Sequence, residues 1–160
     1  MAHWRDTGNL TIRQAVDMPP VWLLGFLIVA YLVGALLPGL VIRSTLLRLL
    51  GGALVCSGLA LMLWSVLKFR AQATSVVPHQ MPKSMITTGP FAFSRNPIYL
   101  GDAMILAGVI LWWGHWPALV LIPAFMVVIE RRFIAPEEAR LKESFGTEFR
   151  KYAEKTRKWA

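Results

Sequence analysis

Three long apolar stretches and a shorter fourth alternate with polar segments along the chain, over residues 21–42, 49–67, 98–116 and 117–129. A helix that crosses a membrane needs roughly 20 mostly apolar residues, and the first three stretches supply about that length. The fourth is shorter, so its helix must borrow from its flanks, where Arg131 and Arg132 can extend toward the lipid headgroups. The pattern predicts four transmembrane helices.

The first two of these helices are expected to form a hairpin with a short connection at Arg43, Ser44 and Thr45. Pro38 should kink the first helix, because proline removes a backbone donor from the helical ladder. Small side chains let membrane helices approach closely. This hairpin carries several of them, namely Gly34, Gly39, Gly51, Gly52, Ser57 and Gly58.

An amphipathic helix is predicted after the fourth apolar stretch. Apolar side chains recur there every three or four residues, at Leu141, Phe145, Phe149 and Tyr152, with Lys and Glu between them. Pro136 suits the first turn of such a helix, and Glu137 and Glu138 would follow it in that turn. Gly146 should weaken the helix or bend it.

The expected fold class is therefore all-α, a polytopic helical membrane protein with about four transmembrane helices and a C-terminal amphipathic helix in the cytoplasm. We expect a single domain. Its segments would be a polar N-terminal tail (1–18), a transmembrane hairpin (19–67), a loop (68–97), a second transmembrane hairpin (98–134) and the amphipathic helix (135–160). The loop contains several prolines, which exclude one continuous helix, and its length favours a functional role.

The composition agrees with a membrane protein. Of the 160 residues, 56% are hydrophobic, and the mean hydropathy of +0.51 is too high for an ordinary soluble domain. No signal peptide is evident at the N-terminus. Cys56 is the single cysteine, which excludes an intrachain disulfide and a cysteine metal cluster. The histidines (His3, His79 and His115) are scattered, so no metal site is expected.

The net charge of +8 matters mainly through its placement. With four helices, the N-terminal tail, the loop and the C-terminal segment share one side, and every Lys and Arg except Arg43 and Arg48 falls there. The positive-inside rule then places both termini and the loop in the cytoplasm. We expect the basic charge to contact anionic lipids rather than nucleic acid, because exposed aromatic residues are not interleaved with it.

Two polar clusters stand at membrane boundaries, residues 87–101 before the third apolar stretch and residues 136–138 after the fourth. They look like two halves of one site at the membrane surface. The glycine-rich phosphate-binding and dinucleotide-binding motifs and the zinc motif H-E-x-x-H are missing. Asp102 lies one turn inside the third stretch, where a carboxylate either serves a function or reaches interfacial water.

Each cluster also has a plain structural explanation. Acidic side chains such as Glu137 and Glu138 are stabilised in the first turn of a helix by its dipole. Arg95 and Asn96 could anchor a helix boundary, and Tyr99 could belong to an interfacial aromatic belt. In the functional alternative, one glutamate accepts hydrogen bonds from a ligand, while the other orients it or pairs with a basic residue. The two cannot easily face one ligand group, because adjacent helical residues point about 100° apart.

The two clusters carry a resemblance to a known superfamily. Residues 89–101, GPFAFSRNPIYLG, resemble the signature G-P-[YF]-x-[YF]-x-R-[HN]-P-x-Y-x-G of the isoprenylcysteine carboxyl methyltransferase and phospholipid methyltransferase superfamily. Residues 137–152, EEARLKESFGTEFRKY, resemble its second signature, E-E-x-x-L-x-x-x-F-G-x-E-[YF]-x-x-Y. Asn96 stands where the eukaryotic prenylcysteine enzymes have His, as in many bacterial relatives. The resemblance covers roughly residues 74–159 and implies a bacterial inner-membrane protein.

The resemblance implies that S-adenosylmethionine is the methyl donor and S-adenosylhomocysteine the product. Carried over residue by residue, the first signature would form one wall of the donor site, with Gly89, Pro90, Phe91, Arg95, Asn96, Pro97, Tyr99, Leu100 and Gly101. Glu137 and Glu138 would form the other wall, and His79 would lie in the loop that closes over the donor. The implied catalytic residues are Arg95, Tyr99, Glu137 and Arg157.

Methyl transfer from a sulfonium requires mainly that acceptor and methyl group be aligned in a site largely closed to water. A carboxylate acceptor would need an orienting cation, for which Arg95, Lys155 and Arg157 are candidates. An amine or thiol would need to lose a proton, for which Glu137, Asp102 and Tyr152 are candidates. A site at the membrane surface can receive a water-soluble donor from the cytoplasm and an apolar acceptor sideways between helices.

The expected function is therefore methyl transfer to a lipophilic or membrane-accessible small molecule, with lipid as the other partner and neither nucleic acid nor metal involved. Two alternatives remain open. One is a membrane reductase of the sterol-reductase type that uses a nicotinamide cofactor. The other is a non-catalytic membrane module whose polar clusters only anchor helices and bind anionic lipid.

Overall fold

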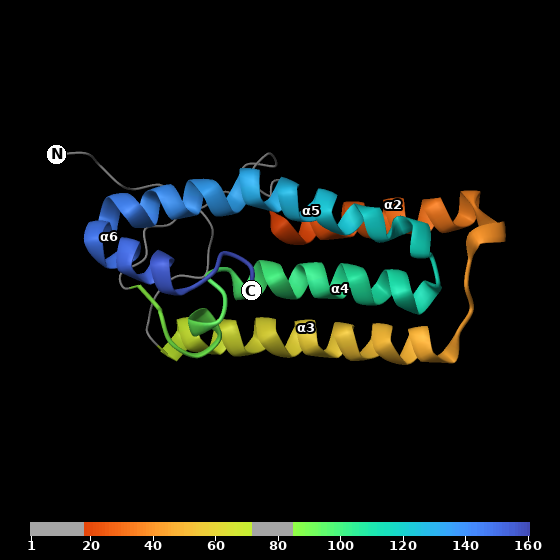
Figure 1. Ribbon diagram of the computed structural model, residues 1–160, viewed down its shortest axis with the longest axis horizontal. Coiled ribbons are helices and arrows are strands. Elements are labelled where there is room, and N and C mark those ends of the chain that lie inside the picture. Colours follow the sequence, from red (N-terminus) through yellow and green to blue (C-terminus); the bar gives the residue numbers. More distant parts are fainter. Residues whose placement is uncertain (1–17, 72–84) are drawn as a thin grey trace, which may run out of the picture.

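The structure, a computed structural model, describes residues 18–71 and 85–160 (Figure 1). Its longer helices are α2 (Pro19–Leu36), α3 (Thr45–Ala71), α4 (Pro97–Trp113), α5 (Leu121–Ile129) and α6 (Ala135–Lys155). The shorter ones are the 3-10 turns η1 (Pro38–Leu40), η2 (Gly89–Ala92) and η3 (Trp116–Val120), and the π-helical segment η4 (Glu130–Ile134). No strand occurs in these ranges, which confirms the all-α class for the described part of the chain. The predicted polar tail, except Met18, and the middle of the predicted loop lie outside the described residues.

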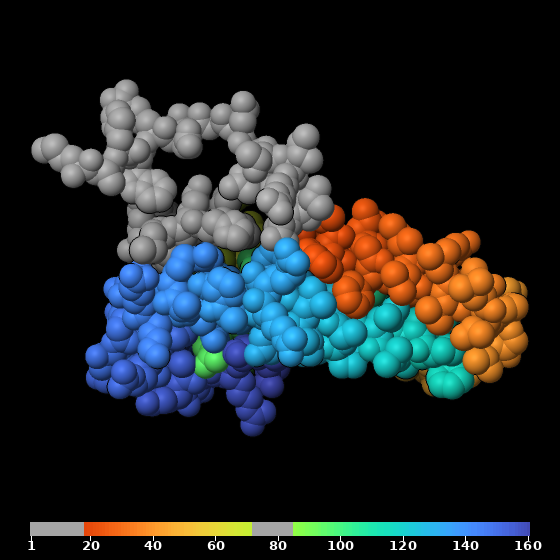
Figure 2. All heavy atoms as spheres, turned by 90° about the horizontal axis from the view of Figure 1, so that it is seen from above, coloured from red at the N-terminus to blue at the C-terminus, as the bar shows by residue number. Residues whose placement is uncertain are grey.

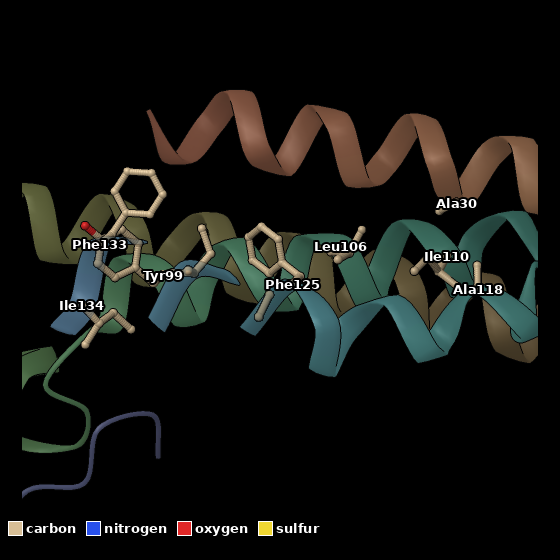
Figure 3. Packing of buried hydrophobic residues seen from close by; sticks show 10 residues of the cluster. Ala30, Tyr99, Leu106, Ile110, Ala118, Phe125, Phe133 and Ile134 are labelled. Carbon is tan, nitrogen blue, oxygen red and sulfur yellow. The ribbon is translucent and has the colours of Figure 1, made fainter. Parts of the chain in front are cut away.

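Helix α4 is the central element of the bundle. It packs against α3 on one side and against α2 and α5 on the other (Figure 1). Leu106 and Ile110 of α4 are fully buried together with Phe125 and Ile129 of α5, and Ala30 of α2 completes this core (Figure 3). Because α4 is covered from three directions, side chains near its first turn lie inside the molecule.

Helices α3 and α4 approach closely where their glycines face each other. A Cβ atom at Gly51 would stand 2.5 Å from the Gly108 carbonyl oxygen, and one at Gly58 would stand 2.8 Å from the Gly101 carbonyl oxygen. Real Cβ atoms do not approach so closely, so the predicted contact role is confirmed at Gly51 and Gly58. A Cβ atom at Gly39 would have no neighbour within 4 Å, so the predicted close contact was wrong there. Of the remaining small residues, Gly34 faces the ring of His115, Gly52 faces the ring of Trp112, and Ser57 is exposed.

Pro38 ends α2 instead of kinking it, so the prediction for this residue was wrong. The helix stops at Leu36, and Pro38 begins the turn η1, because a proline lacks the N–H of the helical ladder and clashes with the preceding turn. The connection to α3 therefore runs over residues 37–44 and is longer than the short turn expected. Within it, the Ile42 N–H donates a hydrogen bond of 3.0 Å to the Gly114 carbonyl. This bond ties the connection to the end of α4.

Helices α2 and α3 are, in the described part of the chain, the two that are long and apolar enough to cross a membrane. They expose large apolar side chains, among them Leu24, Leu36, Leu46, Leu49 and Leu63, and such a surface suits lipid better than water. Helix α4 is apolar but has only 17 residues, about 25 Å at 1.5 Å per residue, and α5 has 9. Two of the four predicted spans thus meet the length requirement, and membrane crossing by α4 and α5 stays a prediction.

The fourth apolar stretch and the amphipathic helix form one continuous helical rod. Helix α5 passes through η4 directly into α6. Pro136 lies in the first turn of α6. The wider π-helical turn that precedes it has room for a ring that would clash in a regular helix interior. Gly146 has φ 48° and ψ −111°, a left-handed backbone conformation that favours glycine, so the predicted bend is confirmed.

Beyond that bend, the second half of α6 runs back toward the bundle, and the C-terminal end comes close to the start of α4 (Figure 1). Figure 2 shows α6 broadening the molecule at the end opposite to residues 37–44. The starts of α2 and α4, the end of α3 and all of α6 thus lie at one end of the molecule. This shared end is where the two polar clusters of the sequence come together.

Candidate functional site

The two polar clusters meet through Tyr99 and Glu137. The Tyr99 hydroxyl, in the first turn of α4, donates a hydrogen bond of 3.3 Å to the Glu137 carboxylate, in the first turn of α6. Tyr99 is buried and its ring lies near the ring of Phe133 (Figure 3). Residues 38 positions apart in the chain are thereby joined at one end of the bundle. The expectation that the clusters are halves of one site agrees with this geometry.

A cavity of about 240 Å³ opens beside this contact. Most of its lining is apolar, and its polar groups come from Arg95, Asn96, Tyr99, Asp102 and Glu137. The complete lining among the described residues is Met18, Pro19, Pro20, Met62, Phe69, Phe91, Arg95, Asn96, Pro97, Ile98, Tyr99, Asp102 and Glu137. A mostly apolar cavity with a few convergent polar groups is the usual form of a small-molecule site.

Glu137 and Glu138 point to different partners. Glu137 lines the cavity, and its burial raises the pKa of its carboxyl, which the Tyr99 hydroxyl and Arg140 partly oppose. Glu138 instead pairs with Arg95 at 2.9 Å and more loosely with Lys158 at 3.8 Å. The predicted pairing of one glutamate with a basic residue is therefore found at Glu138, and ligand binding by Glu137 stays a prediction.

The Arg95 guanidinium is engaged with the C-terminal part of the chain. Its Nε donates to Glu138 at 2.9 Å, and its Nη1 donates to the carbonyls of Ala153 at 2.8 Å and Thr156 at 3.1 Å. The Arg95 backbone N–H also donates to the Arg157 carbonyl at 2.9 Å. Arg95 thus borders the cavity, but its guanidinium donates its hydrogen bonds to α6 and the residue after it, which holds the end of that helix in place. The Arg157 side chain itself is exposed.

Lys158 is a residue whose importance the sequence did not reveal. Its carbonyl accepts hydrogen bonds from the Asn96 side-chain amide at 3.0 Å and the Ser94 hydroxyl at 3.3 Å. Its ammonium pairs with Glu130 at 2.7 Å, and the Trp159 indole donates to the same carboxylate at 3.5 Å. In the sequence, Lys158 is one member of a basic tail. A backbone carbonyl that serves as an acceptor carries no sequence signal.

Tyr152 fixes the turn η2 against the rest of the site. Its hydroxyl donates a hydrogen bond of 2.6 Å to the Phe91 carbonyl, and the Phe91 ring packs edge-on against Phe69 of α3 at 5.2 Å between centroids. Burial raises the pKa of Tyr152 to about 12. The phenol therefore stays protonated at neutral pH and remains a donor to the backbone.

Several predicted residues do not line the cavity. These are Gly89, Pro90, Leu100, Gly101 and Glu138 of the predicted walls and the predicted catalytic Arg157. Gly89 has φ 66°, and a Cβ there would come within 2.8 Å of the Lys68 side chain. Gly101 instead packs against Gly58 of α3. Gly89 is therefore favoured by its backbone conformation and its closeness to Lys68, and Gly101 by its close contact with α3. The remaining predicted residue, His79, lies outside the described residues.

The cavity also has lining residues that the sequence did not indicate. They come from the start of α2, with Met18, Pro19 and Pro20, and from the later part of α3, with Met62 and Phe69. These side chains look like ordinary members of apolar stretches. Their role follows from the way α2 and α3 flank the first turns of α4, which no local pattern specifies.

Comparisons with known proteins identify the family of the chain. The family model described as phospholipid methyltransferase matches residues 46–148, which include the first signature and the start of the second. An uncharacterized protein of Haemophilus influenzae is 39% identical over 62 residues, which are 39% of this chain and 98% of that protein. No solved structure matches the chain significantly. The chain belongs to the phospholipid methyltransferase family, within the superfamily of membrane methyltransferases that also includes the isoprenylcysteine carboxyl methyltransferases.

Proposed function

We propose that this membrane methyltransferase uses S-adenosylmethionine to methylate a lipophilic or membrane-accessible small molecule at the cavity between α4 and α6. The observation that carries the proposal is the contact of Tyr99 with Glu137, which joins the two signature segments at one mostly apolar cavity. A membrane module that only anchored helices would not need a half-buried carboxylate facing such a cavity, because moving a charge out of water is costly.

The lining residues fit the chemistry of this donor. The Glu137 carboxylate would accept hydrogen bonds from ribose hydroxyls or from the ammonium group, and the Tyr99 hydroxyl supports it. The rings of Phe69 and Phe91 offer an apolar surface for the adenine. When bound, S-adenosylmethionine supplies a methyl group on a positively charged sulfur. The chain's part is to bind, to orient the acceptor and to exclude water.

The position of the cavity suits two substrates of opposite solubility. It lies at the end of the bundle that holds α6 and the starts of α2 and α4, the end that the positive-inside rule assigns to the cytoplasm. A water-soluble donor would reach it from that side. An apolar acceptor would reach it from the bilayer. This arrangement supports a bacterial inner-membrane enzyme with its site at the cytoplasmic surface.

The proposal is tested by calorimetric titration of detergent-purified protein with S-adenosylmethionine and S-adenosylhomocysteine. Wild type should bind both saturably. The Glu137→Gln variant should bind at least about tenfold more weakly, because a hydrogen bond to a charged acceptor contributes about 1.5–3 kcal/mol. Glu143→Gln is the matched control, since Glu143 lies exposed on the same helix and away from the cavity, and it should bind like wild type.

Two other results would redirect the assignment. Well-folded wild type that binds neither compound would contradict the proposal, and titration with nicotinamide dinucleotides would then test the reductase alternative. Equal binding by wild type and the Glu137→Gln variant would remove Glu137 from the donor site while leaving the donor itself in place.

A further inference from the structure

A second cavity lies at the end of the bundle opposite to the candidate site. It has a volume of about 360 Å³ and is formed by the end of α2, the connection 37–44 and the end of α4 (Figure 1). Among the described residues, it shares no lining residue with the cavity beside Glu137. Its lining includes Tyr31, Arg43, Trp113 and His115, whose side chains all carry nitrogen or oxygen atoms that can form hydrogen bonds. The proposed methyl transfer makes no use of this cavity.

Contacts within the protein hold the polar wall of this second cavity in place. The rings of Tyr31 and Trp113 meet edge to face with 5.7 Å between their centroids, and the Trp113 and His115 rings lie 5.6 Å apart. The His115 Nδ1 donates a hydrogen bond of 3.2 Å to the Ala30 carbonyl, since a carbonyl oxygen only accepts. A backbone hydrogen bond also ties the connection 37–44 to the end of α4. The wall is therefore organised before any ligand arrives, which favours binding.

Arg43 brings a positive charge to this cavity without an acidic partner. Helices α2, α3, α4 and α5 contain a single acidic residue, Asp102, and it lines the cavity at the other end. Arg43 forms no ion pair with any described residue. The positive-inside rule expects few Lys and Arg in a short connection at the end away from the basic residues, so membrane topology does not account for Arg43. A neutralising anion from outside the described chain does.

The phosphate group of a lipid is the anion that suits this position. A guanidinium is a planar fork that matches the oxygens of a phosphate, and tyrosine and tryptophan side chains add neutral donors. Aromatic side chains of this kind are enriched at the level of the lipid headgroups. The last turns of α2, which border the cavity, expose the apolar side chains of Leu32 and Leu36. Acyl chains attached to the phosphate can therefore lie along this helix.

We propose that the second cavity binds the phosphate group of a phospholipid from the leaflet at this end of the bundle, with Arg43 as the cation. The bound lipid joins the end of α2, the connection 37–44 and the end of α4. It thereby stabilises the end of the bundle that lacks α6. This binding site is independent of the proposed methyl transfer, and no bond is made or broken there.

Native mass spectrometry of the detergent-purified protein tests the proposal, with dioleoyl phosphatidylglycerol as the probe. Each number of bound lipids gives a separate peak, so the loss of one molecule is visible beside any lipid held by α6. The Arg43→Gln variant should bind one lipid molecule at least about tenfold more weakly than wild type, because its charged hydrogen bonds are lost. Arg43 is exposed, so the variant should fold, and an unchanged thermal midpoint checks this.

Arg48→Gln is the matched control for the removal of a charge. Arg48 is exposed near the start of α3, at the same end of the molecule, and does not line the cavity. Its replacement should change lipid binding by no more than about twofold, because an isolated exposed charge contributes little. Equal binding by wild type and Arg43→Gln would overturn the proposal. An equal loss in both variants would also overturn it, because the net charge of this end, and not the cavity, would then hold the lipid.

The shape of the cavity can be changed without altering its charge. A Cβ atom at Gly34 would overlap the His115 ring, so Gly34→Ala should displace that ring and weaken lipid binding. Gly25→Ala is its control, since a Cβ atom there would have no neighbour within 4 Å. Wild-type binding by a folded Gly34→Ala variant would mean that the lipid meets Arg43 outside the cavity, and would overturn the site.

Two further probes separate the parts of the ligand. Dioleoylglycerol has the acyl chains without the phosphate, and inorganic phosphate has the anion without the chains. The lost binding should depend on both parts, so neither compound should compete with phosphatidylglycerol at equal concentration. Competition by dioleoylglycerol would overturn recognition of the phosphate. Competition by inorganic phosphate would overturn the lipid as the ligand and leave a site for a free anion.

Discussion

At the residue scale, Glu137 and Glu138 are neighbours with opposite surroundings. They share the first turn of α6, where a carboxylate is stabilised by the helix dipole. Glu137 faces the cavity, while Glu138 pairs with Arg95 and Lys158 at the edge of the site. The pairing removes one negative charge from the cavity. A ligand therefore meets one carboxylate at the start of α6 and not two.

The raised pKa of Glu137 predicts an unusual pH dependence of donor binding. Burial disfavours its carboxylate, so the group takes up a proton at a pH above the ordinary glutamate value of about 4.5. Protonation removes an acceptor, so the affinity for S-adenosylhomocysteine should fall as the pH is lowered through that raised pKa. The other titratable or charged groups near Glu137 are Tyr99, Asp102, Arg95, Glu138 and Arg140. Calorimetric dissociation constants measured from about pH 8 down to about pH 5 would record the loss.

The Glu137→Gln variant provides the control for this titration. Its weaker binding should not change over the same range, because glutamine does not titrate. The same raised pKa also makes the stability against thermal unfolding depend on pH. Since the folded-state pKa is raised, the ionised carboxyl destabilises the fold above that pKa, and the penalty disappears as the pH falls below the unfolded value. The variant should therefore gain stability relative to wild type as the pH rises. Affinity of wild type that stays constant down to about pH 5 would contradict the prediction.

The sequence identified these polar residues better than it identified their partners. Arg95 and Asn96 were singled out because polar groups at a membrane boundary are costly without a use. Their use in the structure includes binding carbonyls of Ala153, Thr156 and Lys158. A backbone carbonyl can belong to any residue, and these acceptors lie about 60 positions away in the chain. No local pattern could therefore distinguish a ligand contact from a tertiary one.

At the scale of elements, the contact between α3 and α4 depends on paired glycines. Gly51 faces Gly108 and Gly58 faces Gly101, so the two backbones meet without intervening side chains. Small residues at four-residue or longer spacing commonly mark such faces in membrane helices. The contact matters for the site because Met62 and Phe69 reach the cavity from α3, while Tyr99 and Asp102 reach it from α4.

Gly108→Ala should destabilise the protein through this contact. A Cβ there would stand 2.6 Å from the Gly51 carbonyl oxygen and 2.9 Å from the Val55 backbone nitrogen, and neither backbone atom can move aside cheaply. Overpacking of this kind costs about 1–3 kcal/mol. Thermal unfolding of detergent-purified protein should show a lower midpoint than wild type.

Gly25→Ala is the matched control for that substitution. Gly25 lies inside α2, and a Cβ atom there would have no neighbour within 4 Å. Alanine at this position should leave the midpoint unchanged or raise it, since alanine favours a helix over glycine by up to about 1 kcal/mol. Equal midpoints for the Gly108→Ala and Gly25→Ala variants would show that α3 and α4 do not meet through their glycines.

The sequence predicted which segments are helical better than it predicted where each helix ends. The bend at Gly146 follows from one residue with one conformational preference. The continuity of α5, η4 and α6 cannot be predicted from a single residue in this way. Pro136 is compatible both with the start of a new helix and with a helix that widens before it. Which of these forms depends on packing around Phe133 and Ile134, both buried in the core.

At the scale of the whole molecule, charge and shape divide the protein into two unlike ends. One end holds α6, the candidate site and most of the basic residues, and the other holds the connection 37–44 with Arg43. The distribution of basic residues could be read from the sequence once four apolar stretches were assumed. The folding of the C-terminal end back onto the start of α4 could not, because it depends on contacts with Ser94, Arg95 and Asn96.

The orientation of these two ends can be tested by labelling single cysteines with a membrane-impermeant maleimide in intact bacterial cells. Cys56 is the lone native cysteine and lies exposed on α3, so Cys56→Ala provides a cysteine-free background. Ser44→Cys then marks the connection 37–44, and Lys155→Cys marks the end of α6. The positive-inside rule places the end with α6 in the cytoplasm. Ser44→Cys should therefore react in intact cells, while Lys155→Cys should react only after the membrane is permeabilised.

The labelling pattern of the two cysteine variants bears on the candidate site as well as on the membrane topology. S-adenosylmethionine, the proposed donor, is made in the cytoplasm, so it can reach the cavity beside Tyr99 and Glu137 only if that end of the bundle faces inward. Reaction of Lys155→Cys alone in intact cells would reverse the orientation and separate the cavity from its donor. Reaction of both cysteines in intact cells would mean that an even number of helices cross between them. In that case the three helices α3, α4 and α5 would not all span the bilayer, and the shorter α4 and α5 would be the ones in question.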